Sequence, residues 1–166
     1  MQTKEFEKKV RSELDIIFDI DGTLLNIQHR VHHLHKTPPD WKSFNGSMEG
    51  DSPIPEMVEL LQILGNDRGN RLIFCSGRGE ESRAITEKQI SRLLSSISDE
   101  VNSKTINLYL RGVGDFREDP VIKSDLYDQI QEDGFKPTIV FDDRESVVKM
   151  WRGRGLRCLQ VAEGKF

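Results

Sequence analysis

The sequence has little of several features that would assign it to a special class of protein. It contains two cysteines, Cys75 and Cys158, and each lies in a short apolar segment. Disulfide-stapled secreted domains carry more cysteines, and a metal site needs more ligands at closer spacing, so we expect two buried free thiols. Positive charge is not in excess either, because 24 Lys and Arg stand against 28 Asp and Glu. Composition therefore neither indicates nor excludes a nucleic-acid ligand.

Long apolar runs are also missing. The longest have three or four residues, and the mean hydropathy is −0.55, so no segment reaches the length of a membrane span. The first ten residues, MQTKEFEKKV, lack the apolar centre of a secretory signal. We expect a cytoplasmic protein (host cytoplasm if a phage encodes it) without a membrane partner. Its 166 residues suit one domain, with residues 1–12 as a polar N-terminal extension.

Short apolar segments alternate with helical patterns along the chain. The apolar segments are continuous, which suits strands that are covered on both faces of a parallel sheet. They span residues 15–21, 71–77, 107–112, 138–143 and 157–162. Helical spacing of apolar residues occurs between them, at 57–64, 90–97, 122–130 and 147–151. This alternation predicts a three-layer α/β fold.

One segment interrupts the alternation. Residues 24–52 separate the first predicted strand from the first clear helix, which is long for a connection between a strand and a helix. Long connections of this kind are usually functional, and this one follows directly after a pair of aspartates. We predict a small cap or lid here.

Polar side chains follow the carboxyl ends of the predicted strands, where open parallel sheets bind ligands. The first strand ends in Asp19 and Asp21, and the fourth ends in Asp142 and Asp143. Carboxylates that meet at one point need a cation, and hard oxygen ligands favour Mg²⁺. The alternative is a set of helix caps, which accounts poorly for two such pairs.

The same residues suit phosphoryl transfer. Asp19 would attack phosphorus and form an aspartyl-phosphate, and Asp21 would act as general acid and then general base. Gly22 would let backbone N–H groups approach the phosphate. Ser76 and Lys123 would hold its equatorial oxygens.

The chain resembles the haloacid dehalogenase (HAD) superfamily of phosphohydrolases. DIDGT, a strand that ends in Ser76, then Lys123 and the pair DD at 142–143 occur in the order of that superfamily's four motifs. A narrower resemblance, over residues 14–166, is to the 3′-phosphatase domain of bacteriophage polynucleotide kinase/phosphatase and its bacterial and phage relatives. It rests on FDIDGTL, SGR at 76–78, RED at 117–119 and the C-terminal FDDRESVVKMWRGRGLRCLQVAEGKF.

The resemblance implies a HAD-like, Rossmannoid three-layer sandwich with a central, mainly parallel five-stranded sheet. Residues 13–166 would form it, with 24–52 as the cap insertion. The implied activity is that of a phosphoric monoester hydrolase, a Mg²⁺-dependent polynucleotide 3′-phosphatase that acts on DNA or RNA in nucleic acid end repair. The catalytic residues would be Asp19, Asp21, Ser76 and Lys123. The phosphate- or substrate-binding residues would be Gly22, Thr23, Arg30, Gly77, Arg78, Arg117 and Asp119. The metal ligands would be Asp19, Asp142, Asp143 and the backbone carbonyl of Asp21.

Other functions stay open at this stage. A P-loop of the form G-x-x-x-x-G-K-S/T does not occur, so we expect no kinase activity in this chain, and a separate 5′-kinase chain could be its partner. One alternative function is a small-molecule HAD phosphatase such as a nucleotidase. The other is a non-catalytic subunit that docks on a separate kinase or ligase.

Three further signals have two interpretations each. Four histidines, His29, His32, His33 and His35, could bind zinc or lie on a lid helix, with His32 or His33 near the phosphate. Trp41 and Phe44 could stack on a base or cover the apolar rim of the site. The basic residues near the C-terminus could follow a polynucleotide backbone or form a solvated helix face. They are Arg144, Lys149, Arg152, Arg154 and Arg157.

Overall fold

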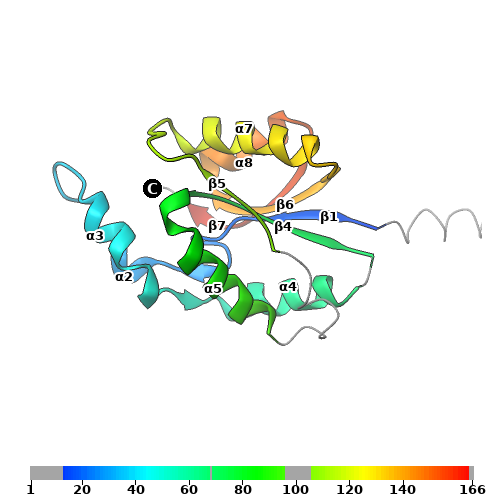
Figure 1. Cartoon of the computed structure of the whole chain (residues 1–166), viewed down its shortest axis with the longest axis horizontal. Helices are drawn as coiled ribbons and strands as arrows, with labels where there is room; N and C mark the ends of the chain where they lie inside the picture. Colours follow the sequence, from blue (N-terminus) through cyan, green and yellow to red (C-terminus); the bar gives the residue numbers. More distant parts are fainter. Residues whose placement is uncertain (1–12, 68, 96–105, 165–166) are drawn as a thin grey trace, which may run out of the picture.

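The computed structural model describes residues 13–67, 69–95 and 106–164. Its centre is a sheet of five parallel strands in the order β5-β4-β1-β6-β7 (Figure 1). The strands are β1 (Asp15–Phe18), β4 (Arg71–Gly79), β5 (Asn107–Arg111), β6 (Ile139–Arg144) and β7 (Arg157–Gly164). Each lies on a predicted apolar segment, so the predicted five-stranded parallel sheet is confirmed.

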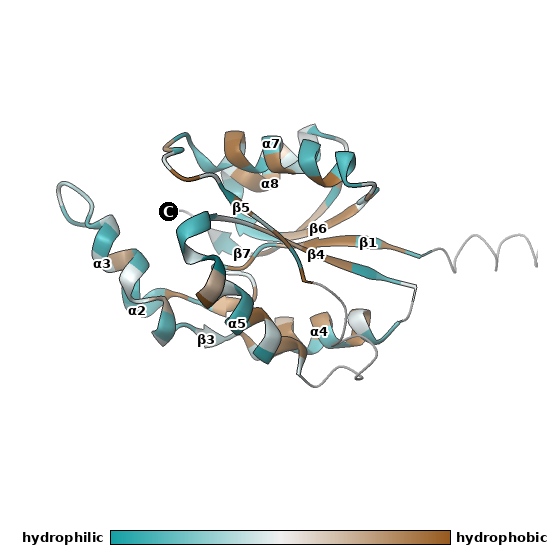
Figure 2. Cartoon of the chain, viewed as in Figure 1, coloured by the Kyte–Doolittle hydropathy of each residue, from teal (hydrophilic) through white to brown (hydrophobic). Residues whose placement is uncertain are grey.

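Helices cover both faces of the sheet (Figure 1). One layer holds α4 (Pro55–Asn66) and α5 (Arg83–Leu94), and the other holds α7 (Asp119–Glu132) and α8 (Glu145–Gly153). Alternate side chains of a strand point to opposite faces, so Phe18 packs in the cluster of α4 and α5, whereas Ile17 packs with Trp151 of α8. Figure 2 shows the central strands as largely hydrophobic and the helices as mixed. The three-layer prediction is confirmed.

Some predictions fall partly outside the described residues. The first part of the predicted helical stripe over 90–97 lies in α5, which ends at Leu94. Ile97 and the N-terminal extension 1–12 lie outside the described residues. Cys75 and Cys158 are buried free thiols, as expected. Within the described ranges, the helices are too short or too polar to cross a membrane.

The insertion after β1 forms a small unit of its own. It contains β2 (Leu25–Asn26), α2 (Gln28–Val31), α3 (Trp41–Gly46), a 3-10 turn η1 (Met48–Gly50) and β3 (Ser52–Pro53). β2 and β3 pair antiparallel, and the Ile54 N–H donates to the Leu24 carbonyl at 2.9 Å. Ile27, Val31 and Phe44 form its apolar centre. The two ends of the insertion therefore lie together at its base.

The chain leaves the sheet soon after β1, which makes this strand shorter than the predicted 15–21. The Asp19 N–H still donates to the Phe141 carbonyl of β6 at 2.9 Å, and then the Leu24 N–H turns back to the Ile20 carbonyl at 2.9 Å. Gly22 lies in this turn with a φ of +84°, a region that favours glycine. The turn places Asp19 and Asp21 at the end of the sheet.

Candidate active site

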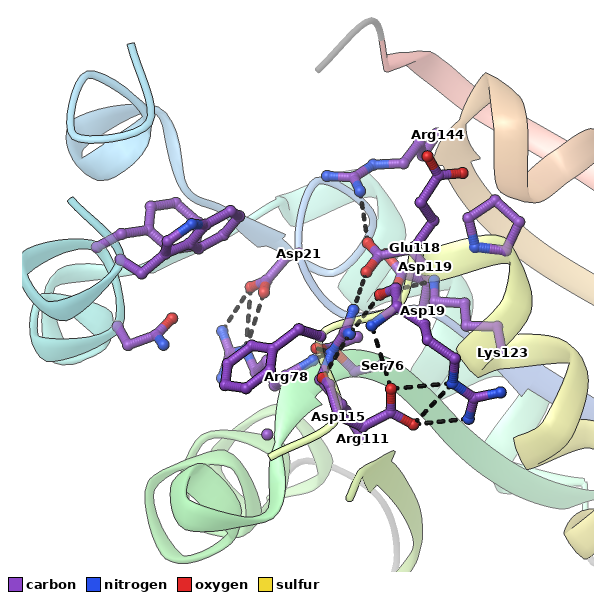
Figure 3. Close-up of a pocket in the computed structure, with 18 of the residues that line it drawn as sticks. Asp19, Asp21, Ser76, Arg78, Arg111, Asp115, Glu118, Asp119, Lys123 and Arg144 are labelled. Carbon is purple, nitrogen blue, oxygen red and sulfur yellow. Dashed lines mark hydrogen bonds and ion pairs between the residues drawn. The ribbon is translucent and has the colours of Figure 1, made fainter. Parts of the chain in front are cut away.

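A cavity of about 690 Å³ lies at the carboxyl ends of the strands (Figure 3). Strand ends, the insertion and the loop 112–118 between β5 and α7 all contribute to its lining. The fold thus brings together most of the predicted site residues. Those that line the cavity are Asp19, Asp21, Ser76, Gly77, Arg78, Arg117, Asp119, Lys123, Asp142 and Asp143.

Three buried carboxylates meet at the floor of the cavity. Asp19 follows β1, and Asp142 and Asp143 lie in β6, with ligand oxygens within 4.8 Å of one another. Lys123 of α7 donates to Asp19 Oδ1 at 2.6 Å and to Asp142 Oδ2 at 2.8 Å. Trp151 Nε1 donates to Asp142 Oδ2 at 3.1 Å. Asp19 and Asp142 are therefore held in place by the surrounding fold, and Asp143 is buried beside them.

The charges at this floor do not balance without a further cation. Burial, together with Asp142 and Asp143, raises the pKa of Asp19 well above its usual value despite the nearby Lys123. Burial and Asp142 raise the pKa of Asp143 to about 6. Three close, buried oxygen ligands with surplus negative charge fit a hard divalent cation such as Mg²⁺. Within the described part of the chain, no other His, Cys, Asp and Glu side chains form such a group. Ligation by the backbone carbonyl of Asp21 stays a prediction.

Gly22 is required at this floor for two reasons. Its positive φ disfavours other residues, and a Cβ at this position would lie 2.2 Å from Asp143 Oδ2. The close approach of this backbone to the Asp143 carboxylate therefore depends on glycine. Ser76, near the end of β4, is buried and lines the cavity, and its Oγ accepts the Arg78 N–H at 3.3 Å.

Asp21 lies in a different environment, a network of ion pairs with Arg78, Arg30 and Asp51. Arg78 Nη2 lies 2.6 Å from Asp21 Oδ1, and Arg30 Nη2 lies 2.8 Å from the same oxygen. Both guanidinium groups also bind Asp51, Arg78 at 2.7 Å and Arg30 at 2.7 Å. Burial opposes ionisation of Asp21, but Arg78 and then Arg30 outweigh it, so the pKa of Asp21 is lowered. This carboxylate is held ionised.

Three predicted phosphate-binding residues, Gly22, Thr23 and Arg30, are not among the side chains that line the cavity. Arg30 of α2 has 0% exposed surface, stacks over the Phe44 ring at 4.2 Å and lies behind Asp21. Thr23 is also fully buried in the turn after Gly22. Neither Arg30 nor Thr23 has exposed surface with which to contact a phosphate in this structure. Arg30 instead contacts Asp21, which does line the cavity.

Asp119 and Gly77 meet at another wall of the cavity. Asp119, at the start of α7, pairs with Arg111 of β5 and with Arg144 of β6 (Figure 3). A Cβ on Gly77 would lie 2.8 Å from Asp119 Oδ1, so glycine leaves room for this carboxylate. Arg117 lies further out, half-exposed, and pairs with Asp115 at 2.6 Å and Asp125 at 2.8 Å. Asp119 therefore ties together the ends of β5 and β6.

The histidines of the insertion do not gather around a metal. His29 Nε2 lies 3.0 Å from the Ser47 carbonyl, and His33 Nδ1 lies 4.0 Å from Asp40. The rings of His32 and His33 lie in contact, tilted by 38° with centroids 4.0 Å apart, and neither residue lines the cavity. Trp41 and Phe44 do line it, with their rings in an edge-to-face contact at 5.9 Å. Phe44 is buried, whereas Trp41 is 58% exposed.

The C-terminal basic residues are dispersed over the structure. Arg144 lines the cavity. Arg154 pairs with Asp128 and stacks on Tyr127 of α7, and Arg152 donates to the Cys158 carbonyl at 3.1 Å. These contacts hold α8 against its neighbours and do not form a continuous track toward the cavity.

Several residues of the site were not predicted from the sequence. Asp51, at the end of the insertion, binds both arginines of the Asp21 network. Thr86 and Gln89 of α5 accept hydrogen bonds from Arg78 Nη1 at 3.1 and 2.6 Å. Arg111 is a polar residue at the end of a strand, which is the pattern that predicted Asp19 and Asp142. Asp51, Thr86 and Gln89 do not lie at the carboxyl ends of strands, so this pattern does not predict them.

Comparison with known proteins places this site in a family. The family model of the polynucleotide kinase PNKP phosphatase domain matches residues 14–166. A viral relative, the putative bifunctional polynucleotide kinase/RNA ligase of Autographa californica nuclear polyhedrosis virus, is 23% identical over 137 residues. This match covers 82% of the present chain and 17% of the viral protein.

Solved structures show the same relationship. A chain of the Pnkp1/Rnl/Hen1 RNA repair complex is 26% identical with a TM-score of 0.70, over 93% of the present chain and 44% of that chain. A haloacid dehalogenase-like family hydrolase from Streptococcus pneumoniae is 14% identical with a TM-score of 0.55, over 89% and 83% of the two chains, and shares the fold. The present chain spans less than half the length of the viral protein and of the repair-complex chain. It belongs, with its HAD-like hydrolase fold, to the family of polynucleotide kinase PNKP phosphatase domains.

Proposed function

We propose that this domain removes the 3′-terminal phosphate from a polynucleotide through an aspartyl-phosphate on Asp19, with Mg²⁺ as cofactor. The observation that carries the proposal is the buried cluster of Asp19, Asp142 and Asp143 in the cavity floor, held by Lys123. The polynucleotide kinase phosphatase family supports the class of substrate. The repair complex among the structural neighbours supports a role in nucleic acid end repair.

Asp19 would carry the covalent step. One of its carboxylate oxygens forms the bond to phosphorus while the bond from phosphorus to the 3′-oxygen breaks. Lys123 binds the Asp19 side chain from one side, and the Ser76 hydroxyl, which lines the same cavity, would donate to a phosphate oxygen. Asp19, Asp142 and Asp143 would hold Mg²⁺, which when bound offsets the repulsion between these carboxylates and the phosphate.

Asp21 would move the protons. It donates a proton to the leaving 3′-oxygen, and it later takes one from the water that attacks the aspartyl-phosphate and releases inorganic phosphate. Its pairing with Arg78 and Arg30 keeps it in the base form that the second step needs. The negative charge of a bound phosphate raises the pKa of a neighbouring carboxylate, which favours the acid form that the first step needs.

A free nucleotide is the second candidate substrate. The cavity of about 690 Å³ lies within the range of small-molecule sites, roughly 300–1,000 Å³, so its volume also suits a nucleotidase. For the polynucleotide phosphatase, a kinase or ligase would act on the ends that this domain prepares. Such a partner is proposed from the composition of the neighbouring repair complex.

The test compares phosphate release from a 3′-phosphorylated oligonucleotide, the same strand phosphorylated at its 5′ end, and free nucleoside monophosphates. DNA and RNA versions are each assayed with Mg²⁺. We expect release from the 3′ end alone, and release mainly from free nucleotides would establish the nucleotidase instead. Asp19→Asn protein from the same purification controls for contaminating phosphatases, and its residual release would have to be subtracted.

Metal removal tests the assignment of the cofactor. Chelation should stop phosphate release, and added Mg²⁺ should restore it, because the carboxylates of the floor repel a phosphate without a cation. Restoration by Zn²⁺ alone would contradict an oxygen-ligated Mg²⁺ site and would redirect attention to the histidines of the insertion.

A further inference from the structure

Phe116 is the most exposed large apolar side chain in the described residues, at 95%. Isolated exposed apolar residues are common on protein surfaces. Phe116 differs because it lines the same cavity as Asp19 and the carboxylate cluster. It contributes almost nothing to the core of this domain, so the fold does not explain why an aromatic ring is displayed at the rim of the site.

The loop that carries Phe116 is held firmly on both sides of it. Arg111 Nη1 donates to the Asp115 carbonyl at 2.9 Å and to the Arg117 carbonyl at 2.6 Å. The Arg117 side chain binds Asp115 at 2.6 Å, and the Asp115 N–H donates to the Gly112 carbonyl at 3.1 Å. The ring is therefore presented by a fixed backbone, which lowers the entropic cost of binding a ligand.

The charged residues of the loop 112–118 favour contact with an uncharged part of a ligand. Asp115 and Glu118 lie on either side of Phe116 and line the same cavity. The guanidinium of Arg117 is already paired with Asp115 and Asp125. A phosphate backbone would meet these carboxylates unfavourably, whereas a nucleobase offers an uncharged π-face of the kind that stacks on aromatic side chains.

A second exposed aromatic lines the cavity from another part of the chain. Trp41 belongs to α3 of the insertion after β1, and Phe116 belongs to the loop after β5. Figure 1 shows α3 and the β5–α7 loop at the same end of the sheet, on separate sides of it. The phosphate-binding floor thus has an aromatic ring on each of two separate rims.

We propose that Phe116 stacks on the terminal nucleobase of the 3′-phosphorylated strand while the phosphate lies beside Asp19. The proposal rests on the proposed polynucleotide 3′-phosphatase function, and it names the residue that distinguishes a nucleotide end from a simple phosphate ester. Phe116 is then a substrate-binding residue with no part in the chemical step.

The test measures kcat/KM for Phe116 variants on three substrates. They are a 3′-phosphorylated oligonucleotide with a normal terminal base, the same strand ending in an abasic 3′-phosphorylated sugar, and p-nitrophenyl phosphate. Stacking on one base changes affinity by about 5- to 150-fold. Phe116→Ala should lose a factor in this range on the first substrate and leave the other two unchanged.

Conservative variants separate stacking from bulk hydrophobicity. Phe116→Trp keeps a ring and should retain wild-type kcat/KM on the base-containing strand, whereas Phe116→Leu should behave as Phe116→Ala does. Val113→Ala is the matched control, because Val113 is 80% exposed on the same loop and does not line the cavity. It should leave all three substrates unchanged.

Two results would overturn the stacking role while leaving the proposed function intact. In the first, the wild type releases phosphate from the base-containing strand and Phe116→Ala does so equally well. In the second, Phe116→Ala loses the same factor on all three substrates. A wild-type protein that hydrolyses p-nitrophenyl phosphate and neither oligonucleotide would overturn the proposed function itself.

Discussion

Asp19 and Asp21 are separated by one residue, yet the fold gives them opposite surroundings. Asp19 shares the cavity floor with two other carboxylates, and burial together with these neighbours raises its pKa. Asp21 faces two guanidinium groups that overcome burial and lower its pKa. Two carboxylates whose pKa values are pushed apart are suited to different tasks. The comparison teaches that neighbours which meet only in the folded chain set the pKa of each aspartate: the β6 carboxylates raise that of Asp19, and Arg78 of β4 with Arg30 of the insertion lowers that of Asp21.

Replacing Asp19 should have the largest effect on activity. In Asp19→Asn the amide cannot act as a nucleophile, so kcat on the 3′-phosphorylated strand should fall by about 10⁴-fold or more. Stability should not fall, because the change removes one of three like charges from the floor. Steady-state kinetics and urea unfolding measure the two quantities. Asp125→Asn, which neutralises a carboxylate outside the cavity lining, is the control, and wild-type turnover by Asp19→Asn would contradict the covalent mechanism.

Replacing Asp21 should produce a smaller loss that depends on the leaving group. Asp21→Asn cannot give a proton to the 3′-oxygen, so turnover of the oligonucleotide should fall by about 10²- to 10⁴-fold. The loss should be smaller on p-nitrophenyl phosphate, because p-nitrophenolate leaves without a proton. The ratio of the two losses is the measurement, and a ratio of one would show that Asp21 is not the general acid.

Removing Arg30 should change the surroundings of Asp21 and leave those of Asp19 as they are, although Arg30 does not line the cavity. Arg30→Ala leaves Asp21 and Asp51 with Arg78 as their shared guanidinium, so the position of Asp21 is less well defined. A hydrogen bond between charged groups contributes about 1.5–3 kcal/mol, which predicts a loss of about 10- to 150-fold in kcat/KM. The loss should be equal on the oligonucleotide and on p-nitrophenyl phosphate.

Arg30→Lys provides a second variant in case Arg30→Ala folds poorly. Lysine keeps the positive charge and lacks the fork that bridges two carboxylates, so part of the loss should remain. Unchanged kinetics in both variants, with unchanged unfolding, would show that the insertion does not position Asp21.

The smallest effect is expected at the other end of β1. Asp15 accepts from Arg71 Nε at 2.6 Å and from the Lys136 N–H at 2.5 Å. Burial opposes its ionisation, but the Arg71 hydrogen bond and the Lys136 N–H outweigh burial and lower its pKa. Because the folded pKa lies below the unfolded value, this contribution is complete above about pH 4 and is lost as the pH falls through the folded pKa.

Urea unfolding of Asp15→Asn at several pH values tests this. The variant should be less stable than the wild type by about 1 kcal/mol near neutral pH, a value discounted for the half-exposed Arg71. The difference should shrink as the pH falls below about 4. Asp128→Asn, which breaks the exposed pair with Arg154, should show a smaller difference at every pH. A constant deficit for Asp15→Asn across the range would mean that its charge is not what stabilises the fold.

The sheet and the floor of the site could be predicted from the sequence because their signals are local. A continuous apolar run predicts each strand, and a polar residue directly after it predicts a ligand at that edge, as with Asp19 and Asp142. Arg111 follows the same rule at the end of β5, and applying the rule to every strand would have included it.

The guanidinium set around Asp21 could not be predicted in this way. Asp51 lies in the polar stretch MEGDSP and is indistinguishable there from a solvated loop residue. Its role arises only when β2 pairs with β3 and brings the end of the insertion back to Arg30. The orientation of Arg30 likewise depends on Phe44, which packs against it across the insertion. Such contacts depend on tertiary packing and leave no periodic trace in the sequence.

The paired ends of the insertion make it an exchangeable module. Because the Ile54 N–H binds the Leu24 carbonyl at the base, a segment of different length can join β2 to β3 without changing the path of the chain through Asp19. Arg30 and Asp51 both lie within this segment, so a transplanted cap would have to bring its own partner for Arg78. Under the proposed function, replacement of this one segment would change substrate preference while Asp19, Asp142 and Asp143 keep their places, provided that the new segment also pairs with Asp21 and Arg78.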